Sequence, residues 1–193
     1  MIAGLILAAG ESSRMGSDKA LLPYRGRTFL ETIIGTLRDA GVERIAVVLG
    51  HHAEEIRRAA NIEGVRVVLN RGYQRGQTTS LQAGLRTLSR PKPEGIVLCL
   101  VDHPAVSAGT IEKLIAAFRQ SPSPVVTPAF QGRRGHPVLI GRPLFEELLS
   151  LGPESGANLV IRRHSAEIQS VEVEDAGVLF DVDDPEIYRQ LPQ

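Results

Sequence analysis

An apolar run near the start of the chain ends in a glycine and continues into a loop that carries two cations. Residues 2–9 are apolar, as is typical of a buried strand. Glycine lets backbone amides approach oxygen atoms closely, and arginine and lysine supply positive charge. The pattern predicts a strand that delivers a loop to a polyphosphate, and the residues involved are Leu7, Ala8, Ala9, Gly10, Ser12, Arg14 and Lys19.

The spacing within this loop excludes the two commonest phosphate-binding motifs. A Walker A loop reads G-x-x-x-x-G-K-[ST], whereas here Gly16 is followed by Ser17, and Lys19 by Ala20. The dinucleotide fingerprint G-x-G-x-x-G is also absent. From the residues alone, an ordinary strand-to-helix loop with surface charges remains an alternative.

Segments with strand and helix patterns alternate along the chain. Residues 95–101 are apolar throughout, as expected for a central strand of a parallel sheet that is covered on both faces. Residues 28–40 have apolar positions at helical spacing, with a capping box formed by Thr28 and Glu31. The other expected strands are 2–9, 44–49, 65–69, 125–130, 137–140 and 168–173, and the other expected helices are 52–60, 78–88, 110–120, 144–150, 157–164 and 185–190.

This alternation predicts a single α/β domain over residues 1–193. Its sheet is expected to be doubly wound, mostly parallel and Rossmann-like, with a small antiparallel extension from the later strands. Ligands of such sheets bind beyond the carboxyl ends of the strands. The loop that follows residues 2–9 therefore lies at the ligand-binding edge.

Charge and cysteine content narrow the classes of function. The chain has 22 basic and 22 acidic residues, which argues against broad binding of nucleic acid or of a membrane surface. The one cysteine, Cys99, lies in an apolar run and is expected to be a buried, inert thiol. We recognise no targeting signal or membrane span, so we expect a cytoplasmic location.

Two acidic segments are candidates for a metal site. Asp102 directly follows the central strand, where it would face the ligand crevice, and Mg²⁺ prefers carboxylate and phosphate oxygens. It stands too far before Ser107 to cap the helix that begins there. Asp181 and Asp183 alternate before the last helix, whereas Asp184 is better placed to cap it. For this second segment, the residues alone fit a metal site and a simple acidic turn equally well.

Two further segments carry polar residues that suit a ligand. Asn70 ends a strand, where its amide could bond a base or a ribose, and Ser80 lies in the first turn of a helix. Helix capping alone would also explain that block. Residues 131–138 read QGRRGHPV, which fits either a cationic turn facing a ligand or a solvated hairpin tip. His51, His52, His103 and His164 are not expected to form a metal-ligand set.

The pattern L-A-A-G-x-S-x-R-M-G-x-x-K-x-L-L, which begins at Leu7, resembles the signature of the MobA-like nucleotidyltransferases. Every fixed position matches, and matching segments continue to Tyr188. The chain looks most similar to the molybdenum cofactor cytidylyltransferase branch, because Ala9 stands where the guanylyl branch usually has glycine. The resemblance implies a fold of the nucleotide-diphospho-sugar transferase type and a Mg²⁺-dependent transfer of CMP from CTP.

The resemblance also implies roles for individual residues. Arg14 and Lys19 would hold the leaving phosphates, and Asp102 would hold Mg²⁺ with Asp183 or, as second choice, Asp181. Arg134, Gly135 and His136 would face a molybdopterin-type acceptor, and a molybdoenzyme or its chaperone would be a further partner. The residues implied in nucleotide binding are Leu7, Ala8, Ala9, Gly10, Ser12, Arg14, Lys19, Asn70, Gly76 and Ser80.

One segment departs from the family pattern and leaves the acceptor open. The family often shows G-D-x-G-A-R, whereas residues 152–158 read GPESGAN, with Pro153 in place of the aspartate and Asn158 in place of the arginine. Two alternatives therefore remain. One is a sugar- or polyol-phosphate nucleotidyltransferase, and the other is a non-catalytic chaperone that binds the molybdenum cofactor. The retention of both acidic segments favours an enzyme.

Overall fold

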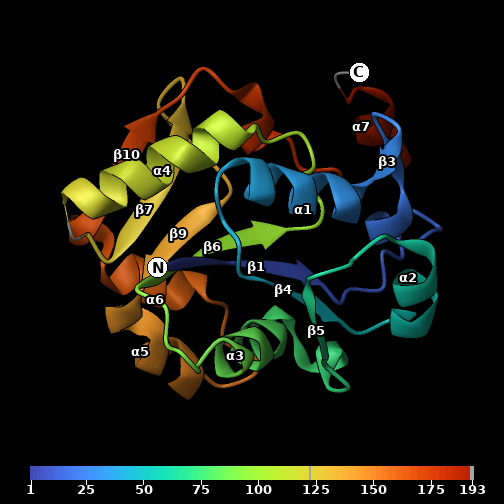
Figure 1. The fold of residues 1–193 in the computed structure, drawn as a ribbon, viewed down its shortest axis with the longest axis horizontal. Coiled ribbons are helices and arrows are strands. Elements are labelled where there is room, and N and C mark those ends of the chain that lie inside the picture. Colours follow the sequence, from blue (N-terminus) through green and yellow to red (C-terminus); the bar gives the residue numbers. More distant parts are fainter. Residues whose placement is uncertain (122, 192–193) are drawn as a thin grey trace.

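The computed structural model describes residues 1–121 and 123–191. A mixed sheet of eight strands runs through it in the order β10-β7-β9-β6-β1-β4-β5, with β8 paired to β7 outside this path (Figure 1). The strands of this sheet are β1 (Ile2–Ala8), β4 (Ile45–Leu49), β5 (Arg66–Leu69), β6 (Gly95–Leu100), β7 (Val125–Phe130), β8 (Arg133–Arg134), β9 (Val138–Gly141) and β10 (Ile168–Glu172).

The strand directions confirm the predicted mostly parallel sheet. β1 runs parallel to both of its neighbours, β4 and β6, and the pairs β4–β5 and β7–β10 are also parallel. β9 lies antiparallel between β6 and β7, and β8 is antiparallel to β7. These two strands form the small antiparallel extension expected from the sequence.

Helices cover both faces of the sheet, as β1 illustrates. Its side chains alternate, so that Ile2, Ile6 and Ala8 join one buried cluster, whereas Leu5 and Leu7 join the other. The first cluster is covered by α1 (Phe29–Asp39), α2 (Ala53–Ala59) and α4 (Ala108–Gln120), and the second by α3 (Gln77–Thr87), α5 (Phe145–Ser150) and α6 (Asn158–Arg163) (Figure 1).

Side-chain caps fix where three of the helices begin. The expected capping box of α1 is present, because Thr28 accepts from the amide of Glu31 and the Glu31 carboxylate accepts from the amide of Thr28. Ser107 caps α4, so Asp102 is not used as a cap. Asp184 caps the last helix, α7 (Pro185–Arg189), through the amides of residues 186 and 187.

The C-terminal segment packs against a hairpin that the sequence did not predict. Strands β2 (Pro23–Tyr24) and β3 (Arg27–Thr28) pair with each other apart from the main sheet. Tyr24 and Phe29 form a third buried cluster with Val182, and the Tyr188 hydroxyl donates to the carbonyl of Pro23 at 2.7 Å. This packing fixes the segment 181–183 beside the loop that follows β1.

Two expectations from composition can be compared with the structure. Cys99 is buried in β6, as expected, and its burial raises the pKa of the thiol to about 12, which disfavours the reactive thiolate. Within the described ranges, no helix has both the length and the apolar character that crossing a membrane requires.

Candidate functional site

A cavity of about 270 Å³ lies at the carboxyl ends of β1 and β6, where the sheet topology predicts a ligand. The loop that follows β1, residues 10–19, forms one wall, and we call it the glycine loop. Of the residues singled out in the sequence, the cavity is lined by Leu7, Ala8, Ala9, Gly10, Ser12, Arg14, Lys19, Ser80, Asp102 and Asp183.

The glycine loop folds back on itself and places Lys19 inside the cavity. Ser12 adopts a left-handed backbone conformation with φ of 50°, and its hydroxyl accepts from the amide of Lys19 at 3.1 Å. Lys19 begins the short 3-10 helix η1 (Lys19–Leu21) and is only 9% exposed. A buried lysine is almost always paired with a negative group, so its position indicates where negative charge gathers in the site.

Two carboxylates surround the Lys19 ammonium group. Its Nζ lies 2.7 Å from Asp183 Oδ1 and 3.6 Å from Asp102 Oδ2. Asp183 also pairs with the exposed Arg14, whose Nη2 lies 2.8 Å from Asp183 Oδ2. The hydrogen bond from Lys19 is the largest influence that lowers the pKa of Asp183, so this carboxyl is ionised at neutral pH.

Asp102 has an environment that suits a cation. Burial raises the pKa of its carboxyl, and Lys19 acts in the opposite direction. Its Oδ1 atom is buried and has no hydrogen-bond partner among residues 1–121 and 123–191. Buried polar atoms are nearly always satisfied, so an unpartnered carboxylate oxygen next to a polar cavity fits a metal ligand.

Asp181 and His103 complete a cluster around Asp102. These three residues each offer a ligand atom, and the three atoms lie within 4.8 Å of one another. Burial and the nearby Asp102 both raise the pKa of Asp181. From the sequence, we did not expect His103 to belong to a metal-ligand set, although its place directly after Asp102 at the end of a buried strand was a usable signal. A second such group is formed by Asp18, His52 and Glu55.

The predicted acceptor residues separate in the structure. The His136 ring packs against the His103 ring at an angle of 39°, with ring centroids 4.7 Å apart, and burial is the main reason that the pKa of His136 is lowered to about 4. Arg134 belongs to β8 rather than to a loose turn, and its Nε donates to Ser170 at 2.9 Å. Gly135 packs so tightly on the Val178 carbonyl that a Cβ would overlap it. Only His136 therefore lies beside the acidic cluster.

Asn70 joins two elements of the scaffold. Its Nδ2 lies 2.9 Å from the hydroxyl oxygens of both Thr79 and Ser80, and its Oδ1 accepts from the amide of Gly72. These contacts tie the end of β5 to α3. Asn70 and Gly76 are not among the residues that line the cavity, whereas Ser80 is. Their roles in nucleotide binding stay predictions.

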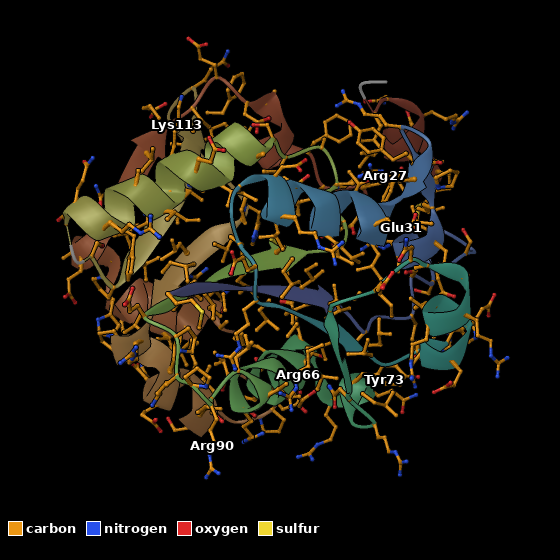
Figure 2. The ribbon with its side chains drawn as sticks, viewed as in Figure 1. Arg27, Glu31, Arg66, Tyr73, Arg90 and Lys113 are labelled. Carbon is orange, nitrogen blue, oxygen red and sulfur yellow. The ribbon has the colours of Figure 1, made fainter. Side chains whose placement is uncertain are left out.

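Tyr73 is a cavity residue that the sequence did not indicate (Figure 2). Its hydroxyl lies 3.2 Å from Nδ1 of His51. A Cβ at Gly50 would come within 2.7 Å of both the Ala9 carbonyl oxygen and the Tyr73 ring. This close approach explains the glycine at the end of β4, because any side chain there would push Tyr73 away from the end of β1.

Comparison with known sequences points to one family. The model of the MobA-like NTP transferase domain matches residues 4–168. The nicotine blue oxidoreductase of Paenarthrobacter nicotinovorans is 32% identical, with 98% of this chain and 96% of that protein covered. The molybdenum cofactor cytidylyltransferase of Escherichia coli is 27% identical, with 94% and 91% covered.

Solved structures with similar folds cover nearly the whole chain. Rv0371c of Mycobacterium tuberculosis superposes with a TM-score of 0.84 at 33% identity, covering 98% of this chain and 96% of that one. A complex of Rv0371c with manganese gives a TM-score of 0.80 at 31% identity, with coverages of 98% and 97%. A nucleotidyl transferase from Methanothermobacter gives 0.84 at 27% identity, with coverages of 99% and 95%.

Proposed function

The chain belongs to the MobA-like NTP transferase family, and from this premise we propose that it transfers CMP from CTP to the phosphate of a molybdopterin-type acceptor. Its similarity over nearly full length to a molybdenum cofactor cytidylyltransferase supports the choice of substrates. The observation that carries the proposal is the position of Lys19, with its ammonium group between Asp102 and Asp183 in the cavity beside the glycine loop.

In the proposed reaction, an oxygen of the acceptor phosphate attacks the α-phosphorus of CTP. The bond from the α-phosphorus to the bridging oxygen breaks, and pyrophosphate leaves with the electron pair. A phosphomonoester is already anionic near neutral pH, so the reaction needs no strong protein base. It needs charge neutralisation and alignment, and Arg14 and Lys19, which both line the cavity, would hold the leaving phosphates.

A divalent cation is part of this proposal. When bound, Mg²⁺ would neutralise charge on the phosphates while Asp102 holds it with Asp183 or Asp181. The unpartnered Oδ1 of Asp102 is the structural feature that fits. The manganese complex of the related Rv0371c supports a divalent cation without specifying Mg²⁺. Asp183 holds both Lys19 and Arg14, so an incoming triphosphate would compete with its carboxylate for these cations.

The remaining roles follow from position. Leu7, Ala8, Ala9, Gly10, Ser12 and Ser80 would contact the nucleotide, because they line the cavity. Asn70 and Gly76 would act by holding the wall that carries Ser80. On the acceptor side, His136 lies closest to the acidic cluster, and Arg134 and Gly135 would act further out. We retain one nucleotidyltransferase domain over residues 1–193, a molybdoenzyme or its chaperone as partner, and a cytoplasmic location as predictions.

A pyrophosphate-release assay tests the proposal. The full chain would be incubated with CTP, GTP or ATP, with and without molybdopterin, and with Mg²⁺ or a chelator. We expect release only when CTP, molybdopterin and the divalent cation are all present. Release with a sugar phosphate or polyol phosphate in place of molybdopterin would keep the transferase chemistry but replace the acceptor. Absence of release with every pair of substrates would overturn the proposal.

A redox function is the second candidate, and it rests on the relative named nicotine blue oxidoreductase. A loop that holds a triphosphate could also hold the pyrophosphate of a dinucleotide. The two candidates differ in product, because a reductase consumes NADH or NADPH and releases no pyrophosphate. Measuring the absorbance of the reduced dinucleotide in parallel with pyrophosphate therefore separates them.

A further inference from the structure

We infer that His103 is a third ligand of the divalent cation in this site, together with Asp102 and Asp181, and that its imidazole shifts the metal preference from Mg²⁺ toward Mn²⁺. The inference rests on the proposed function for the presence of a cation at Asp102. It goes further by naming a nitrogen ligand and the metal selectivity that a nitrogen ligand produces.

The distance between His103 and Asp102 is the first argument. Nε2 of His103 lies 3.9 Å from Oδ1 of Asp102, which is too long for a hydrogen bond. Two ligand atoms that share one cation at about 2.0–2.2 Å each can be separated by up to about 4.4 Å. The pair is therefore spaced as two ligands of one ion, and Asp181 offers a carboxylate oxygen within 4.8 Å of a ligand atom of each of the other two residues.

Burial is the second argument. His103 is 9% exposed, and Oδ1 of Asp102 is buried without a hydrogen-bond partner in the described part of the chain. A buried carboxylate oxygen without a partner carries the full cost of its desolvation. A cation bound between the two side chains would remove that cost. Within the described residues, no hydrogen bond to Oδ1 of Asp102 does so.

Charge is the third argument. Lys19 and Arg14 both pair with Asp183, whereas Asp181 forms no ion pair with any residue in 1–121 or 123–191. Lys19 Nζ also approaches Asp102 Oδ2 at 3.6 Å, so Asp181 is the carboxylate of this cluster that has no basic partner among the described residues.

Two other groups of histidine and carboxylates lack these features. His52 Nδ1 lies 2.9 Å from Asp18 Oδ2, so that pair is already hydrogen-bonded, and the His52 side chain is 53% exposed. His164 contacts Glu167 through Nδ1 and Glu147 through Nε2. Because these nitrogens are on opposite sides of the ring, His164 cannot gather both carboxylates around one ion. These two histidines provide matched controls.

A nitrogen ligand has a predictable effect on selectivity. Mg²⁺ is a hard cation that binds oxygen ligands almost exclusively and keeps several of its waters. First-row transition cations accept imidazole nitrogen, and Mn²⁺ also suits carboxylates. A site with two carboxylates and one imidazole should therefore prefer Mn²⁺ over Mg²⁺. Replacing the imidazole should accordingly reduce Mn²⁺ binding more than Mg²⁺ binding.

The test uses the full chain and Mn²⁺ alone, with electron paramagnetic resonance as the readout. Titration gives the Mn²⁺ affinity, and competition gives the Mg²⁺ affinity. Pulsed measurements detect modulation from a coordinated nitrogen. We expect nitrogen modulation in the wild type, in His52→Gln and in His164→Gln, and none in His103→Gln. The His103→Gln variant should also lose about tenfold or more in Mn²⁺ affinity, with a smaller change for Mg²⁺.

Bound Mn²⁺ without nitrogen modulation in the wild type would overturn the inference, as would modulation that persists in His103→Gln or disappears in His52→Gln. If His103→Gln does not fold, labelling the wild-type chain with ¹⁵N-histidine shows whether the coordinated nitrogen belongs to a histidine, and nitrogen modulation that persists in His136→Gln excludes the neighbouring ring as its source. Failure of the proposed function is distinguishable. In that case the nitrogen modulation is present, but no substrate pair releases pyrophosphate with either metal.

Discussion

The replacement Lys19→Ala is expected to cause the largest loss of turnover of any single change in the glycine loop. The substitution removes a cation that lies 2.7 Å from Asp183 and 3.6 Å from Asp102. Removing one preorganised group that stabilises developing charge costs about 2.7–4 kcal/mol, which is about a 10²–10³-fold loss in kcat. The enclosed position of Lys19 places it in this range, because water screens a buried charge poorly.

Loss of Lys19 should also change the pH dependence of metal binding. Burial raises the pKa of Asp102, and the Lys19 charge is the main factor that lowers it. Without Lys19, the pKa of Asp102 rises further, so a larger fraction of this carboxyl is protonated at a given pH. Metal binding requires the carboxylate, so the pH at which half of the Mn²⁺ affinity is lost should move upward in Lys19→Ala.

The assay for this prediction is pyrophosphate release under saturating substrates, combined with Mn²⁺ titration across pH. Lys113→Ala is the matched control, because it removes an exposed lysine from α4, far along the chain from the glycine loop (Figure 2). The turnover of Arg14→Ala should lie between those of Lys19→Ala and Lys113→Ala, because the Arg14 side chain is 69% exposed and pairs with Asp183 alone among the described residues. Turnover near the wild-type value in a folded Lys19→Ala variant would refute the assignment of Lys19 to the leaving phosphates.

Three further predictions concern other parts of the chain. Asp102→Asn should abolish cation-dependent pyrophosphate release while circular dichroism stays unchanged; full activity would exclude Asp102 as a ligand. Gly84→Ala should lower the free energy of unfolding by about 1–3 kcal/mol in urea, because the new Cβ would overlap Leu5 of β1; an unchanged midpoint would contradict this packing. The pKa of His164 is raised above 6.5 by its hydrogen bonds to Glu167 and Glu147. Its contribution to stability is therefore fully present below pH 6.5 and is lost as the pH rises through the folded pKa, so His164→Gln should be less stable than the wild type in acid and equally stable in alkali.

The elements that the sequence predicted well are those whose pattern is local and long. The apolar run of β6 and the capping box at Thr28 and Glu31 depend on neighbouring residues only, and both are confirmed. The β2–β3 hairpin was not predicted, because strands of two residues show no periodicity. Asn70 shows another limit. A polar residue at a strand end suits a ligand or a neighbouring helix equally, and only the position of Thr79 and Ser80 shows that its amide is used within the scaffold.

Asp181 and Asp183 show why a metal site is harder to derive than a fold. Their alternation predicts that both side chains lie on one side of the segment, and the buried Val182 between them packs on the other side, as expected. Their difference comes from elements distant in the sequence. The glycine loop brings Lys19 next to Asp183, and the lysine lowers the pKa of this carboxyl. Asp181 lies beside Asp102, which follows β6, and there the pKa of Asp181 is raised. Asp183, the first choice from the family pattern, thus already pairs with two basic side chains, Lys19 and Arg14. Asp181, the second choice, has no ion pair among the described residues. Since a cation is attracted most strongly where negative charge is least compensated, we propose Asp181 as the partner of Asp102, and Asp183 would become available if a triphosphate competed with it for Lys19 and Arg14.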